Sequence, residues 1–371
     1  MSLMLAVGLR ANKPKRNVGV INAGAYFALA IQKNGRAWGW GTNAIGQLGD
    51  NSTISKRTPV SVAGAAKTFC KIAAGKYYNS LAIDKNGRAW GWGNNYYGGI
   101  GDNTSVCRCT PVSVLGAVKT FCQIAAGASH SLAIDKNGKG WGWGYNSSGQ
   151  LGNNSYGLQR TPVSFFGSYT FCKIAAGEYF SLGISKQGRA FSWGDNVFGQ
   201  LGNNNNIGQA NPQSVLGAVK TFCQIAGGYL HSLAIDKNGR AWGWGYNNSG
   251  QLGNNSTVSK LTPVSVLGAV KTFCQIAGGY LHTVAIDKNG RAWAWGRNTE
   301  GQLGDNSTIS KQTPVSIAGA VKTFCQISAG GYYSLAIDKN GRAWGWGYNS
   351  YGGLGDNSIV SKLTPVRVCN I

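Results

Sequence analysis

Acidic residues, histidine and long apolar runs are all scarce in this chain of 371 residues. It carries 12 Asp and Glu against 35 Lys and Arg, a formal net charge of +23. No apolar run approaches the roughly 20 residues that a membrane-spanning helix needs. Paired carboxylates that could act as general acid and base are missing. These shortages argue against an enzyme and against a transmembrane segment.

One stretch recurs along most of the chain: Asp-Lys-Asn-Gly-Arg-Ala-Trp-Gly-Trp-Gly, as at 236–245. The first Trp of each copy, replaced once by Phe, falls at Trp38, Trp90, Trp141, Phe191, Trp242, Trp293 and Trp344. The successive gaps are 52, 51, 50, 51, 51 and 51 residues. A fixed period of this length indicates one supersecondary unit repeated seven times.

Each unit predicts four short strands, which in the fifth copy cover 222–226, 232–235, 240–245 and 263–266. Asn-Gly at 238–239 predicts a tight hairpin with positive φ at both residues. Pro263, at the start of the fourth predicted strand, is typical of an outer edge, where a missing N–H does no harm.

Four antiparallel strands per repeat of about 51 residues, seven times over, predict an all-β fold, a seven-bladed β-propeller over 17–371. A linear solenoid is the alternative, but the first and last units lack the polar caps that solenoids need. Residues 1–16 are expected to form an N-terminal arm or a strand that closes the ring. The Trp-Gly-Trp residues are expected to pack neighbouring blades together.

Several motifs of the repeat resemble one known family. Ala-Gly-x-x-His-Ser-Leu-Ala-Ile at 126–134, Trp-Gly-x-Asn-x-x-Gly-Gln-Leu-Gly at 143–152 and the recurring Thr-Pro-Val look like the regulator-of-chromosome-condensation propeller family. The resemblance covers 17–371 and suggests a bacterial or phage-type member. It implies the fold but not one function, because that family includes a nucleotide exchange factor, a plant UV-B photoreceptor and β-lactamase inhibitors.

Two of those functions fit this sequence poorly. The photoreceptor resemblance implies Gly-Trp-Arg-His-Thr, where this chain has Tyr280 and Leu281 in place of Trp and Arg. No blade insertion could form the wedge of an exchange factor, and no acidic stretch could meet a basic GTPase.

Cysteine and histidine follow the repeat as well. Six of the nine Cys share one position: Cys70, Cys122, Cys172, Cys223, Cys274 and Cys325. We expect them to be free, buried and structural, which favours a reducing compartment. His130, His231 and His282 also share one position and are expected to be structural, with hydrogen bonds to the backbone. No catalytic, cofactor or metal site is predicted, and the loop Asp and Asn residues are expected to form Asx turns.

Positive charge is expected to gather on one side of the propeller, the basic face, formed by the second–third turns and the blade links. The turns contribute Lys85, Lys136, Lys237, Lys288 and Lys339, and the links contribute Lys67, Lys119, Lys220, Lys271 and Lys322. These ten residues are the candidate anion-binding set.

The opposite side, the tyrosine face, carries the turns that differ most among repeats. Its candidate partner-binding residues are Tyr26, Tyr77, Tyr78, Tyr179, Tyr229, Tyr280 and Tyr332 in the inner turns, with Tyr97, Tyr246 and Tyr348 in longer loops. Tyrosines among Asn, Ser and Gly are typical of recognition surfaces. The fourth unit departs most from the others, for example at Glu178, Ser185 and Phe191.

The sequence therefore favours a non-enzymatic scaffold that binds a protein through the tyrosine face. The alternatives are a binder of an anionic polymer (nucleic acid, acidic glycan or lipid surface) through the basic face, and a structural surface or virion component. The apolar N-terminus lacks the preceding charge of a signal peptide, so a cytoplasmic or virion-associated protein is expected. The partner and the oligomeric state stay open.

Overall fold

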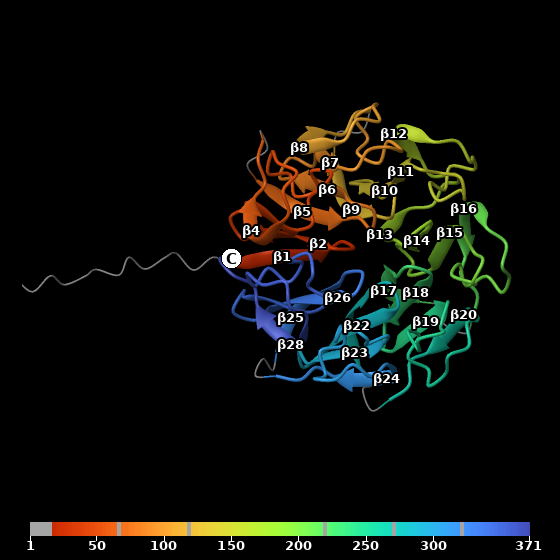
Figure 1. Ribbon diagram of the computed structural model, residues 1–371. Coiled ribbons are helices and arrows are strands. Elements are labelled where there is room, and N and C mark those ends of the chain that lie inside the picture. Colours follow the sequence, from red (N-terminus) through yellow and green to blue (C-terminus); the bar gives the residue numbers. More distant parts are fainter. Residues whose placement is uncertain (1–16, 65–67, 117–119, 218–220, 269–271, 320–322) are drawn as a thin grey trace, which may run out of the picture.

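Seven four-stranded antiparallel sheets surround a central axis in the computed structural model (Figure 1). It describes residues 17–64, 68–116, 120–217, 221–268, 272–319 and 323–371. Each sheet takes four consecutive strands, as in β17-β18-β19-β20. The predicted seven-bladed β-propeller is confirmed. Within the described residues no helix is long and apolar enough to cross a membrane. The expected arm or closing strand at 1–16 lies outside them.

The four strands of each blade are arranged in chain order from the channel outward. The innermost are β1 (Val18–Ala23), β5 (Phe69–Ala74), β9 (Phe121–Ala126), β13 (Phe171–Ala176), β17 (Phe222–Gly227), β21 (Phe273–Gly278) and β25 (Phe324–Ala329). Next come β2 (Phe27–Gln32), β6 (Asn79–Asp84), β10 (His130–Asp135), β14 (Phe180–Ser185), β18 (His231–Asp236), β22 (His282–Asp287) and β26 (Tyr333–Asp338). The third are β3 (Ala37–Gly41), β7 (Ala89–Gly93), β11 (Gly140–Gly144), β15 (Ala190–Gly194), β19 (Ala241–Gly245), β23 (Ala292–Gly296) and β27 (Ala343–Gly347). The outermost are β4 (Lys56–Ser61), β8 (Arg108–Ser113), β12 (Gln159–Ser164), β16 (Gln209–Ser214), β20 (Lys260–Ser265), β24 (Lys311–Ser316) and β28 (Lys362–Arg367).

The Asn-Gly hairpin between β18 and β19 is confirmed, but its predicted turn type is wrong. Only Gly239 has positive φ, at +82°, and its N–H donates to the Asp236 carbonyl over 2.9 Å. Asn238 has ordinary φ. The connection is therefore a three-residue loop in which a right-handed turn precedes one left-handed glycine.

The outer strand also starts earlier than predicted. β20 begins at Lys260, so Pro263 lies inside the strand rather than at its start. The pairing of β20 with β19 is irregular there, because Gly243 faces Val264 while Gly245 faces Lys260. The proline sits in this irregular stretch of an outermost strand, where no neighbouring strand needs its N–H.

The prediction that the six repeated cysteines are buried is wrong. All six are exposed and all nine cysteines are free. In β17, Phe222 pairs with Asp236 and Gln224 with Ile235, so Cys223 is the extra residue of a β-bulge. Its thiol lies 3.4 Å from the carbonyls of Ile235 and Asp236. The bulge turns this side chain away from the core.

Neighbouring blades meet at the second Trp of the repeat, as predicted. Trp244 is fully buried, and its indole N–H donates to the Gln200 carbonyl of the preceding blade over 2.9 Å. The Ser232 hydroxyl donates to the same carbonyl over 2.7 Å. A Cβ on Gly202 would come within 2.8 Å of the indole nitrogen, so this loop position must be glycine. Side chains of both blades complete one core cluster around the indole.

The first Trp of the repeat also packs against the cluster shared by two blades, as predicted, but its hydrogen bond lies within its own blade. Trp242 is half-buried, and its N–H donates to the Asp236 carboxylate of its own hairpin over 3.0 Å. Asp236 also accepts the N–H groups of Asn238 and Arg240. In the fourth blade Ser185 replaces Asp and Phe191 replaces Trp. The indole–carboxylate hydrogen bond is therefore absent from the fourth blade, since a phenyl ring has no N–H to donate.

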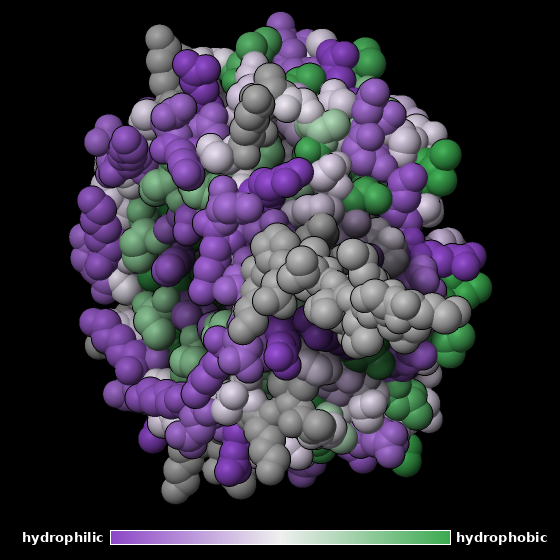
Figure 2. Space-filling model, turned by 90° about the vertical axis from the view of Figure 1, so that its left-hand side faces the viewer, coloured by the Kyte–Doolittle hydropathy of each residue, from purple (hydrophilic) through white to green (hydrophobic). Residues whose placement is uncertain are grey.

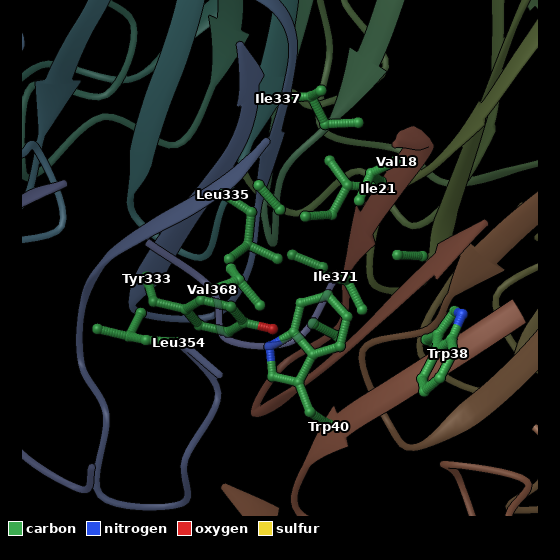
Figure 3. Packing of buried hydrophobic residues seen from close by; sticks show 14 residues of the cluster. Val18, Ile21, Trp38, Trp40, Tyr333, Leu335, Ile337, Leu354, Val368 and Ile371 are labelled. Carbon is green, nitrogen blue, oxygen red and sulfur yellow. The ribbon is translucent and has the colours of Figure 1, made fainter. Parts of the chain in front are cut away.

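The same joint closes the ring between the last blade and the first, so the solenoid alternative is wrong. Trp40 donates to the Gly353 carbonyl over 2.8 Å and packs beside Tyr333, Leu354 and Val368 (Figure 3). The two blades share no sheet. Val18 N–H reaches the Gly341 carbonyl at 3.0 Å and completes the contact.

The two tryptophans of one repeat should differ sharply in their effect on stability. Trp244→Phe should lower the free energy of unfolding by about 2–3 kcal/mol, because it leaves a cavity and removes the inter-blade hydrogen bond. The double variant Asp236→Ser/Trp242→Phe copies the pair of the fourth blade and should cost about 1 kcal/mol or less. Urea denaturation measures both, and equal losses would contradict the assigned roles.

Candidate functional site

The turns between first and second strands surround one mouth of the channel, and backbone hydrogen bonds join them at six of the seven blade junctions. The N–H of Lys76 donates to Gly127 at 2.9 Å, that of Glu178 to Tyr229 at 3.3 Å, and that of Gly331 to Ala25 at 3.1 Å. Each bond joins one blade to the next, the last to the first. The turns are thus held at fixed relative positions, which gives their side chains a rigid base.

Tyrosines from all seven blades gather on this base. One run of ring contacts joins Tyr97, Tyr145, Tyr179 and Tyr77, with centroid separations of 4.7, 5.9 and 6.2 Å. A second joins Tyr229, Tyr280, Tyr332 and Tyr26, at 4.7, 5.2 and 6.3 Å, and continues to Tyr348 and Tyr351. Most of these rings are half-buried, and Tyr97 and Tyr351 are exposed.

Eight of the ten tyrosines predicted from the sequence belong to these two runs. The other two have different contacts: Tyr246 packs on Phe198 at 4.7 Å, and Tyr78 lies 6.4 Å from Phe27. Tyr145 and Tyr351, which also lie in the divergent loops, complete the set. Their role in binding stays a prediction.

Two ionisable side chains, Glu178 and Lys76, lie between the two runs. Glu178 accepts a 2.6 Å hydrogen bond from the Tyr77 hydroxyl, and burial raises the pKa of this carboxyl. The Lys76 ammonium crosses the channel to the carbonyls of Gly227, at 3.4 Å, and Gly228. Burial lowers the pKa of Lys76 to about 7, against the opposing effect of Glu178. A cavity of about 240 Å³ lies below, lined by inner-strand residues, Lys76 and Tyr280.

The role of Lys76 was not predicted from the sequence. The available signal was that other units have Ala, Glu, Tyr or Gly at its position, so that one lysine stands alone among seven turns. Its reach across the channel could not be seen, because it depends on the closed ring bringing the second blade opposite the fifth.

An apolar rim surrounds the tyrosines and was not predicted either. The loop before the outermost strand exposes a β-branched side chain in six blades, with exposed fractions of 57–67%: Ile54, Val106, Ile207, Val258, Ile309 and Val360. The loop is anchored from inside, since the buried Asn247 amide donates to the carbonyls of Ser256, at 2.9 Å, and Val258, at 3.1 Å. The space-filling side view shows separate hydrophobic side chains along its right-hand edge (Figure 2).

The three histidines are structural, as expected, but they bond to side chains of the next blade. His130 is fully buried with Nε2 3.0 Å from the Ser181 hydroxyl, and His282 pairs with Ser334 at 3.1 Å. Burial lowers the pKa of all three imidazoles to about 3. They are neutral at physiological pH.

On the opposite side, the hairpin tips expose the five turn lysines of the candidate anion set, together with the Arg or Lys after each glycine. The tip of Gly239 meets the blade link, because Phe273 N–H donates to its carbonyl at 2.7 Å. Ion pairs among the described residues involve none of the tip cations. The link lysines, Lys67, Lys119, Lys220, Lys271 and Lys322, lie outside the described residues.

The part of the chain that the structure describes holds no group of three His, Cys, Asp or Glu residues that could bind a metal ion. The loop aspartates are engaged in Asx turns, as predicted: Asp50 Oδ1 accepts the Ser52 N–H over 3.2 Å. No residue was predicted to hold a cofactor.

The closed ring and the Trp joint define a class of seven-bladed propellers with about fifty residues per blade. A family profile described as the RCC1-like domain matches residues 71–370, and one described as the regulator of chromosome condensation repeat matches 34–82. The chain belongs to the RCC1-like family.

Relatives of this chain have diverse names. The ultraviolet-B receptor UVR8 of Arabidopsis thaliana is 26% identical over 362 residues, 96% of this chain and 70% of that protein. The probable E3 ubiquitin-protein ligase HERC6 of Homo sapiens is 31% identical over 324 residues, 85% of this chain but 27% of that protein. Yeast RCC1 (Prp20), solved with Kap60, has a TM-score of 0.80 at 20% identity, covering 100% of this chain and 91% of that one.

Acid should destabilise the protein through its histidines. The pKa of each imidazole is lower in the folded chain than its ordinary value of 6.5. Below pH 6.5 the imidazoles of the unfolded chain therefore bind protons, whereas those of the folded chain stay neutral. Stability is therefore lost as pH falls from about 6.5 towards 3. Between pH 7 and 5 we expect a loss of roughly 1–2 kcal/mol per histidine.

The control replaces all three histidines by Asn, the residue of the second blade at this position (Asn79). Urea denaturation at both pH values should show a smaller acid-induced loss in this variant. An identical loss in variant and parent would contradict the assignment.

Proposed function

We propose that this protein is a non-enzymatic scaffold that binds a protein partner through its tyrosine face. The single observation that carries the proposal is the convergence of tyrosines from all seven blades on one channel mouth, in mutual contact. Tyrosine offers a large amphipathic contact area at low entropic cost, and rings already held by neighbours lose little further freedom on binding.

The surroundings of the tyrosines support the same function. The apolar rim adds exposed aliphatic contacts outside the aromatic centre, and the loops carrying it are fixed by buried asparagines. An apolar and aromatic centre with polar groups between is the usual anatomy of a protein interface. The turns of this face differ from blade to blade, whereas the core positions repeat.

Structures of a family member agree with a binding role. Yeast RCC1 has been solved bound to Kap60, and a second structure of it is described together with binding to Gsp1p and histones. Its 20–22% identity to this chain supports a shared fold, so the partner of this protein is a separate question.

The test is affinity capture from the organism that makes the protein, with three baits compared. Tyr229→Ala/Tyr280→Ala should weaken binding of the captured protein by at least about 30-fold, because central aromatic residues are typical hot spots. Lys237→Gln/Lys288→Gln, on the opposite side, should bind like the parent. If the tyrosine variant keeps full affinity, or the lysine variant loses it, the partner does not use this face.

A second candidate function is binding of an anionic polymer through the basic face. The observation that favours it is the chemistry of the hairpin tips, where Lys237 and Arg240 are exposed. The nearby Asp236 carboxylate accepts hydrogen bonds from the turn and from the Trp242 indole instead of pairing with these cations. Exposed tip cations recur around the ring, and those among the described residues form no ion pair. A ring of such cations attracts polyanions.

A heparin column tests this second function. The protein should be retained at physiological salt, and Lys237→Gln/Lys288→Gln/Lys339→Gln should elute earlier, with a slope of log affinity against log salt that is shallower by about one per lost contact. Tyr229→Ala/Tyr280→Ala should elute with the parent. Flow-through of the parent at physiological salt would contradict the idea.

A further inference from the structure

The outer wall of the propeller is hollowed between the third and fourth blades. The cavity, of about 440 Å³, is lined by β16, by the loop before β16, and by residues that follow β12. Both strands are outermost in their blades and lie at the perimeter in Figure 1. None of the described residues that line the cavity is charged, although the chain as a whole carries a net charge of +23.

Two exposed aromatic rings stand at this cavity. Phe166 is 52% exposed and Tyr169 is 43% exposed. The ring of Tyr169 is supported from behind, at 4.6 Å from Phe191 and 6.2 Å from Phe171. Phe191 is the one residue of its repeat position that is not Trp. An open aromatic ring fixed by buried neighbours presents a flat apolar platform without further ordering.

Primary amides line the same cavity as the aromatic rings. Gln213 Nε2 donates to the side-chain Oδ1 of Asn211 over 2.8 Å, which fixes both side chains. Asn205 accepts the Ile207 N–H through its own oxygen at 2.9 Å. The Nδ2 groups of Asn205 and Asn211 and the Oε1 of Gln213 make no hydrogen bond within the described residues. One wall of the cavity therefore offers donors and acceptors that a ligand can bond to.

The other six blades show that this arrangement departs from the repeat. They have Thr where Asn211 stands and Val where Gln213 stands, and five links have Lys where Tyr169 stands. These three departures, distant in sequence, come together in one cavity. Drift at independent surface positions does not by itself explain such convergence.

We propose that this cavity binds a neutral carbohydrate. An aromatic ring packs against the apolar C–H face of a pyranose, and amides, each both donor and acceptor, bond to its hydroxyl groups. The uncharged lining gives no attraction to sulfated or carboxylated glycans. The site lies apart from the tyrosine face, so this proposal does not depend on the proposed binding of a protein partner.

Saturation-transfer NMR tests the site with four neutral probes: cellotetraose, maltotetraose, chitotetraose and mannotetraose. Irradiation of the protein's aromatic protons should transfer saturation to at least one probe, most strongly to C–H protons of one ring face. Asn211→Thr/Gln213→Val and Tyr169→Lys, which restore the residues of the other blades, should each reduce the transfer at least fivefold. Tyr229→Ala/Tyr280→Ala should leave it unchanged.

Three results would overturn the proposal. One is no transfer to any of the four probes. Another is transfer that survives both restoring variants, which would place the sugar elsewhere. The third is binding of a heparin tetrasaccharide or of an extended peptide along β16 in preference to the neutral sugars. The restored residues are those of the other blades, and thermal unfolding of each variant checks that the fold is retained.

Discussion

The hydrogen bond from each second-position indole to a carbonyl of the preceding blade is the constraint on which this propeller depends. At Trp244 it combines a fully buried side chain with an N–H that must be satisfied, so indole and carbonyl have to meet in one orientation. The glycine beside the carbonyl leaves room for the ring. Trp40 makes the same contact across the last joint, which closes the ring without a shared sheet.

This constraint separates what each blade must keep from what it can vary. The core lies in the strands, and each joint also constrains the loop residues that carry the accepting carbonyl and the adjacent glycine, such as Gln200 and Gly202. Other turn positions at the tyrosine face are not constrained in this way and differ from unit to unit. The fourth unit shows the principle inside a blade: Ser185 and Phe191 replace the Asp–Trp pair together, and Tyr169 packs on the smaller ring. The positions that differ among repeats are therefore those outside the core and the joints.

The period and the Asn-Gly hairpins sufficed to predict the propeller, because both are local and repeated seven times. The sequence also predicted that the divergent tyrosines share one face, since strand order fixes which turns lie together. Cys223 was misjudged because a bulge reverses its side chain, and Pro263 because irregular pairing admits it inside a strand. Lys76 and the cavity at Tyr169 depend on contacts between blades, which no local pattern contains.

Hydrogen exchange of the tryptophan indoles tests the central claim most directly. If one kind of joint holds the ring together at every blade, the N–H groups of Trp40, Trp92, Trp143, Trp193, Trp244, Trp295 and Trp346 should exchange only through large-scale opening. Their protection should be similar, approach that of global unfolding, and exceed that of the half-buried Trp242 by orders of magnitude. Exchange of Trp40 or Trp244 as fast as that of Trp242 would contradict the account.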